Sequence, residues 1–135
     1  MKKNEIGQAI LRVMLGFIFF IHGVDKFRGG INYIVEYFES LGIPGFMAYV
    51  VAIIELVGGI ALILGIGTRI VAILTALIMV GAIFTAKLSL GLLGVDGMAG
   101  YEIDLALLAM SIYLILARKI YLSLDSLMFK KQENN

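Results

Sequence analysis

Seven ionisable side chains inside or beside the long apolar stretches of this sequence are candidates for chemistry. They are Arg12, His22, Lys26, Glu55, Lys87, Glu102 and Asp104. A charged group in hydrocarbon is energetically unfavourable, so such groups are expected to face a protein interior and to have a partner. Carboxylates and histidine can exchange protons, while arginine and lysine donate hydrogen bonds to ligand oxygens. Any chemistry of this chain is therefore expected among these seven residues.

Two of these residues are predicted to meet near the middle of the membrane. Counting along the apolar stretches at about 1.5 Å per residue puts Arg12 and Glu55 near mid-membrane depth on antiparallel spans. We therefore predict that they pair, directly or through water. Two functions stay open for the pair: a structural ion pair, or a substrate or proton site.

Four charged or titratable groups, Glu55 among them, are predicted to form a polar pocket that opens outward. They are His22, Glu55, Lys87 and Glu102. Glu102 and Asp104 lie two residues apart, so on a helix they point to nearly opposite faces, and Lys87 could neutralise either. Histidine can carry a proton near neutral pH. The alternative is that these residues only anchor the helix ends at the membrane interface.

The elements that must position these residues are predicted to be transmembrane helices. Hydrophobic residues make up 61% of the 135 residues and charged residues 16%, against roughly 45–50% and about 25% in a soluble domain. A span needs about 20 mostly apolar residues. Stretches of suitable character are 6–24, 46–64, 70–86 and 101–117. We predict an all-α, integral membrane four-helix bundle as one domain over 1–129, followed by a polar, disordered tail over 130–135.

A short amphipathic helix is predicted between the first and second spans. Apolar residues recur at helical spacing from Ile31 to Leu41, while Glu36 and Glu39 face elsewhere, and Pro44 follows shortly afterwards. This segment is too short to span, so it should lie at the interface or over one end of the bundle. The connection after Lys87 is glycine-rich and should loop over the same side. The second and third spans are joined by a very short turn, so they should be antiparallel neighbours.

The distribution of basic residues predicts the orientation. With four spans, one side of the membrane receives Lys2, Lys3, Arg69, Arg118, Lys119, Lys130 and Lys131. Lysine and arginine concentrate on the cytoplasmic side of membrane proteins. We therefore expect a multi-pass protein of the bacterial plasma membrane with both termini in the cytoplasm. The first apolar run lacks a small-residue cleavage site, so it is interpreted as a retained span.

Several function classes find no support in the sequence. With no cysteine, thiolate metal sites, iron–sulfur ligation and thiol redox chemistry are excluded within the chain. A single histidine with carboxylates is a poor set of ligands for a transition metal or haem. The segment 65–69 is not a dinucleotide loop, because no strand precedes it and a third glycine is missing. A net charge of +1 argues against binding nucleic acid.

The order and spacing of several short motifs resemble those of the DoxX family of small bacterial membrane proteins over nearly the whole chain. These motifs are Leu11-Arg12, Gly16, His22-Gly23, Lys26-Phe27, Leu41-Gly42-Ile43-Pro44, Glu55-Leu56-Val57-Gly58-Gly59, Leu64-Gly65, Thr68-Arg69, Gly100-Tyr101-Glu102 and Ser123-Leu124-Asp125. The resemblance implies a four-helix membrane bundle with signature polar positions at Arg12, His22, Glu55 and Glu102. Many relatives carry a histidine near the end of the third span, where this chain has Ala86 and Lys87.

The resemblance also implies a function in oxidoreductase chemistry. Some members resemble subunits of thiosulfate:quinone oxidoreductases, and others accompany responses to quinones, catechols or oxidative stress. We expect an oxidoreductase component that binds a quinone in the outward pocket. The expected catalytic residues are His22, Glu55 and Glu102; the expected substrate-binding residues are Arg12, Lys26, Lys87 and Asp104.

The sequence shows no redox-cofactor site of its own, so electrons would come from a soluble oxidoreductase or dioxygenase partner or from the quinone pool. The alternative is a non-catalytic scaffold for a soluble oxidoreductase, or a small-molecule carrier. The sequence leaves the oligomeric state open, including a homo-oligomer, and the lipid bilayer is the expected environment.

Overall fold

The computed structural model describes residues 2–133, and within that range every regular element is helical. Four long helices form the bundle: α1 (Lys2–Arg28), α3 (Phe46–Leu64), α4 (Thr68–Ala82) and α5 (Glu102–Leu116). Short elements complete the chain: α2 (Ile31–Ser40), the π-helical turn η1 (Ile83–Lys87), the 3₁₀ turn η2 (Leu88–Leu90) and α6 (Leu124–Glu133). The predicted all-α membrane bundle is confirmed.

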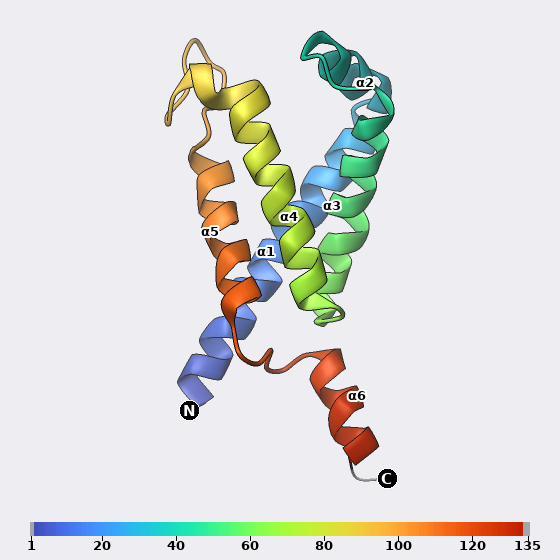
Figure 1. Ribbon diagram of the computed structural model, residues 1–135, viewed down its shortest axis with the longest axis vertical. Coiled ribbons are helices and arrows are strands. Elements are labelled where there is room, and N and C mark those ends of the chain that lie inside the picture. Colours follow the sequence, from blue (N-terminus) through green and yellow to red (C-terminus); the bar gives the residue numbers. More distant parts are fainter. Residues whose placement is uncertain (1, 134–135) are drawn as a thin grey trace.

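Two helix pairs make up the bundle, and they diverge toward one end. In Figure 1, α4 and α5 lie side by side on the left, while α3 runs beside α1 on the right. The pairs come together at the bottom, where residues 65–67 connect α3 to α4, and separate toward the top. The predicted short turn between antiparallel neighbours is therefore present.

Glycines allow α1 and α3 to pack backbone against backbone. A Cβ atom on Gly16 would lie 2.6 Å from the Gly59 carbonyl oxygen, and one on Gly59 would lie 2.6 Å from the Gly16 oxygen. Two turns further along the same face of α1, a Cβ on Gly23 would lie 2.7 Å from the Leu56 nitrogen. Small residues at such contacts are typical of membrane helices, whose association depends on close packing rather than on the hydrophobic effect. These contacts fix the register of α1 against α3.

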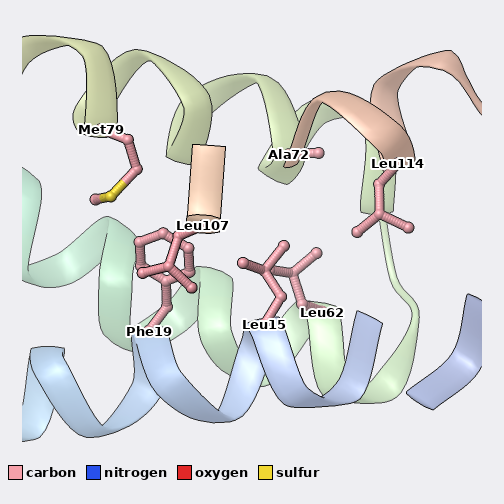
Figure 2. Close-up of a cluster of buried hydrophobic side chains, with 7 residues drawn as sticks. All are labelled: Leu15, Phe19, Leu62, Ala72, Met79, Leu107 and Leu114. Carbon is pink, nitrogen blue, oxygen red and sulfur yellow. The ribbon is translucent and has the colours of Figure 1, made fainter. Parts of the chain in front are cut away.

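Apolar side chains from both pairs fill the space where the pairs meet. Figure 2 shows the buried cluster: Leu15, Phe19, Leu62, Ala72, Met79, Leu107 and Leu114. Between α4 and α5, the fully buried hydroxyls of Thr75 and Ser111 lie within hydrogen-bonding distance, at 3.0 Å. Each hydroxyl is also within hydrogen-bonding distance of a carbonyl oxygen of its own helix, Thr75 of Ala72 and Ser111 of Leu107, so the contact adds a polar link between the two helices. The core therefore joins all four long helices.

Among residues 2–133, three helical segments are long and apolar enough to cross a membrane. They are Lys2–Arg28, Phe46–Leu64 and Thr68–Leu90, the last running through both short turns after α4. The predicted fourth span is a helix, but α5 has 15 residues and is shorter than the other three segments. Large apolar side chains such as Ile10, Phe17, Ile53 and Leu77 point outward and are exposed, as expected for surfaces that face lipid.

The two longer connections lie at the same end of the bundle, as predicted. Helix α2 packs against α1 and α3, while residues 88–101 fold over the end of α4 and α5 (Figure 1). In the second connection, the backbone N–H of Tyr101 donates to the Gly91 oxygen at 3.2 Å, and that of Glu102 to the Leu92 oxygen at 3.1 Å. We call this the cavity end, and the opposite end the basic end.

At the basic end, hydrogen bonds fasten α1 to the segment that follows α5. The Gln8 side chain donates to the Lys119 carbonyl oxygen and accepts from the Tyr121 N–H, both at 2.8 Å. The chain then enters α6. The tail expected to be disordered from residue 130 is helical as far as Glu133, because lysine, glutamine and glutamate are good helix formers that extend α6. Residues 134 and 135 lie outside the described range.

Candidate functional site

A cavity of ≈ 370 Å³ opens at the cavity end between the two diverging helix pairs. Six of the seven residues singled out in the sequence line it: His22, Lys26, Glu55, Lys87, Glu102 and Asp104. They come from α1, α3, η1 and α5, so they are separated in sequence and brought together by the fold. The structure thus places these residues around one cavity, as expected for the polar pocket predicted from the sequence. Their chemical roles stay a prediction.

One ion pair in the cavity joins α1 to α3. The Lys26 ammonium donates to both carboxylate oxygens of Glu55, at 3.0 and 2.9 Å. Glu55 is only 3% exposed, so its charge is balanced inside the protein rather than by solvent. The close approach of Gly23 to Leu56 brings the two helices near enough for this contact.

A second ion pair joins the end of the α4 segment to α5. The Lys87 Nζ lies 2.7 Å from Oδ2 of Asp104, a buried carboxylate in the first turn of α5. Lys87 is the last residue of the π-helical turn. A π turn takes in more residues than an α turn, so it changes the direction of the side chains that follow it, and such turns are frequent at functional sites. Lys87 was expected to neutralise Glu102 or Asp104, and its partner is Asp104.

Of the six residues, His22 and Glu102 are the two that are not held in an ion pair within the described part of the chain. Nδ1 of His22 lies 2.8 Å from the Ile18 carbonyl oxygen. If Nδ1 carries the hydrogen, Nε2 is left as a hydrogen-bond acceptor. Both side chains are exposed, so both are accessible to a ligand.

The remaining walls of the cavity are mainly apolar and partly aromatic. Phe19 and Leu107 of the core line it, as do Tyr37 and Phe38 of α2. Ligand pockets typically combine such walls with a few convergent polar groups, at volumes of about 300–1,000 Å³. The cavity is therefore suited to a small, largely apolar molecule with polar substituents.

The predicted pairing of Arg12 with Glu55 is wrong. The Arg12 guanidinium donates to the carbonyl oxygens of Leu62 and Leu122, both at 3.0 Å, and Glu55 is paired with Lys26. Arg12 is buried at the basic end and is not among the residues that line the cavity. The guanidinium hydrogen-bonds a carbonyl group near the C-terminus of α3, where a positive charge is favourable.

The register of α1 against α3 explains this error. Because Gly16 faces Gly59, residues earlier in α1 face the end of α3, and residues later in α1 face its middle. Counting depth along each apolar stretch carries no information on this register, so Arg12 was placed opposite Glu55 although it lies against Leu62. The glycine spacing was a usable signal: Gly16 and Gly23 lie on one helical face, and Lys26 follows on that same face.

The residues 2–133 hold no cluster of three or more histidine, aspartate or glutamate side chains arranged for a metal ion. The fold and the cavity define the class: a small, multi-span helical membrane protein with paired charges around an apolar pocket. The family model for DoxX matches residues 7–88, more than half of the chain, so this protein belongs to the DoxX family. The matched region includes Arg12, His22, Lys26, Glu55 and Lys87, and it ends before α5.

Similar proteins agree with this assignment. The chain is 45% identical over 133 residues to "Putative oxidoreductase CatD" of Bacillus subtilis, covering 98% of this chain and 95% of that relative. It is 33% identical over 131 residues to "Uncharacterized membrane protein Rv3486" of Mycobacterium tuberculosis, covering 90% and 80%. "Inner membrane protein YqjF" of Escherichia coli matches at 33% over 75 residues, covering 56% and 57%. No solved structure matches the chain.

Proposed function

We propose that this DoxX-family protein is a membrane oxidoreductase component that binds a quinone in the cavity between the helix pairs. The observation that carries the proposal is the convergence of six charged or titratable side chains on a cavity with aromatic walls. The 45% identity to a protein named "Putative oxidoreductase CatD" supports the same reaction class.

In this proposal the apolar walls hold the quinone ring and the polar groups meet its oxygens. The ammonium groups of Lys26 and Lys87 keep hydrogens that can be donated to the two ring carbonyls. Reduction of a quinone to its quinol consumes two electrons and two protons. His22 and Glu102 supply the protons, because their side chains are exposed to the cavity and not held in ion pairs within the described residues. A soluble oxidoreductase partner supplies the two electrons. In the reverse direction, a quinol from the membrane pool gives two electrons to that partner and releases two protons.

The direct test is purification from native membranes in mild detergent, followed by an absorption spectrum and organic extraction for quinone. We expect quinone from the wild-type protein and from Lys2→Gln, a matched control at the opposite end. We expect much less from Lys87→Gln, which removes a cavity cation at a partly exposed position. Equal quinone in all three samples, or none in any together with no binding of added quinone, would exclude the proposed ligand.

The second candidate is a non-catalytic scaffold or a small-molecule carrier. The observation in its favour is that the two lysines of the cavity are each neutralised by a carboxylate of the adjacent helix. Paired charges of this kind can serve only to fix how helices associate. A host lacking the protein separates the candidates. The test introduces into this host a variant without the charges of His22, Glu55, Lys87 and Glu102. The variant restores function if the protein is a scaffold, and it does not restore function if the protein is an oxidoreductase component.

The orientation that accompanies this proposal has both termini in the cytoplasm of a bacterial cell. Its support is the concentration of Lys2, Lys3, Arg69, Arg118 and Lys119 at the basic end, because basic residues favour the cytoplasmic side. The cavity then opens toward the outside of the cell.

A further inference from the structure

A second and larger cavity, of ≈ 900 Å³, lies at the basic end, away from the candidate quinone site. It is bounded by the start of α4 and by the segment that leads from the end of α5 into α6, which crosses beneath the bundle in Figure 1. Both helices end here, so the cavity lies at the level of the lipid headgroups if they span the bilayer. No part of the proposed redox chemistry uses it.

Three cations line this cavity: Arg69, Arg118 and Lys119. The Arg69 guanidinium is held by the carbonyl oxygens of Ala117 and Arg118, while the side chains of Arg118 and Lys119 make no ion pair with a described residue. Both of the latter side chains are exposed.

Two carboxylates, Glu5 and Asp125, also line the cavity. Oδ2 of Asp125 accepts a hydrogen bond of 2.7 Å from the Gly67 N–H at the start of α4. This carboxylate is thus hydrogen-bonded to the N-terminus of α4, where negative charge is favourable. The cations exceed the carboxylates, and the cavity keeps a positive charge.

A buried hydroxyl beside the cations has no hydrogen-bond partner among the described residues. Thr68, the first residue of α4, is 3% exposed, and its Oγ1 forms no hydrogen bond within the described part of the chain. Buried polar atoms are nearly always satisfied, so an unpaired one in a cavity wall indicates a ligand or solvent group that completes it. The side chain also stands at a helix N-terminus, where anions are favourably bound.

Apolar side chains also line this cavity. They are Ile70, Ile120, Leu122 and Leu127, and all but Ile120 are exposed. A site that combines cations with exposed aliphatic groups matches a molecule with an anionic head and hydrocarbon chains.

We propose that this cavity binds one anionic phospholipid, with its phosphate against Arg118, Lys119 and the Thr68 hydroxyl. Its acyl chains follow Ile70 and the apolar surface around Leu122. The inner leaflet of a membrane is the richer source of anionic lipid, and basic residues beside a span recognise it. The site is independent of the quinone cavity, so either proposal can fail without the other.

The experiment measures lipid binding to the delipidated, detergent-purified full chain by native mass spectrometry and thermal melting. The probes are phosphatidylglycerol, phosphatidylcholine and inorganic phosphate. We expect a one-to-one phosphatidylglycerol adduct and a higher melting temperature, with little effect of phosphatidylcholine. The double variant Arg118→Gln, Lys119→Gln should bind phosphatidylglycerol about 30-fold more weakly, since each basic residue near the surface contributes roughly fivefold.

The matched control is Lys2→Gln, Lys3→Gln, which removes two cations from the same end outside the cavity. It should bind like the wild type. Thr68→Val keeps the shape but not the hydroxyl, and should weaken binding about threefold with the lipid-free melting temperature unchanged. Three results overturn the proposal: equal affinity for both lipids, equal weakening by the two double variants, or displacement of the lipid by millimolar inorganic phosphate.

Discussion

The ion pair between Lys26 and Glu55 gives a quantitative test of the helix register. Glu55 is the more buried partner: its side chain is 4% exposed, against 20% for Lys26. Lys26→Met leaves a buried carboxylate without its counter-charge, which lowers the free energy of unfolding by about 3–5 kcal/mol in comparable cases. Glu55→Leu should be less harmful, because the remaining ammonium can move toward the cavity opening. The double variant should recover about 2 kcal/mol of the summed loss.

The assay is a double-mutant cycle measured by circular dichroism during reversible unfolding with sodium dodecyl sulfate in mixed micelles. The control cycle combines Arg12→Leu with Glu55→Leu. These residues lie at different ends of the bundle and share no partner, so their effects should add within about 0.5 kcal/mol. A coupling between Arg12 and Glu55 that exceeds the one between Lys26 and Glu55 would refute the register described here.

Three further predictions concern topology, physiology and packing. Reporter fusions after Asn135 should report the cytoplasm and fusions at Gly94 the outside, because basic residues gather at one end; an external C-terminus would mean that the spans are miscounted. Deleting the protein should sensitise its host to quinones and catechols more than to detergent in growth assays, and equal sensitivity to both would argue against a redox role. Gly16→Ala should lower the free energy of unfolding by about 1–3 kcal/mol, since its Cβ would lie 2.6 Å from the Gly59 oxygen. Gly81→Ala, where a Cβ meets nothing within 4 Å, is the control, and similar losses for both variants would contradict the close packing of α1 and α3.

The sequence predicted the elements well because long apolar runs have few alternatives. The predicted second span 46–64 coincides with α3, and the amphipathic segment after residue 30 became α2. Gly65 ends α3 with a φ of 76°, a conformation that glycine adopts readily, so that boundary was also readable. The extension of α1 to Lys2 and of α6 to Glu133 was not predicted, because polar helix ends carry no hydropathy signal.

The arrangement of charges was harder to predict than the helices. Six of the seven chosen residues line one cavity, since charges in apolar spans must turn inward and most of these lie at the same end of their helices. The partners were less predictable, because pairing depends on the register between helices, and one turn of error exchanges one partner for another. The π turn that ends at Lys87 could not be recognised from its residues, although it directs the Lys87 side chain toward Asp104.

The placement of the hydrogen bonds and ion pairs has a mechanical consequence. Gln8 and Arg12 fasten α1 to the chain after α5, so the basic end is cross-linked between the two helix pairs. At the other end, each ion pair joins helices of the same pair, and no ion pair among the described residues connects one pair to the other. The two helix pairs are thus fastened to each other at the basic end, while no ion pair of the described residues holds them together at the cavity end. Moving the pairs further apart at the cavity end would break neither ion pair, and it would give a bulky hydrophobic molecule a sideways route from the bilayer.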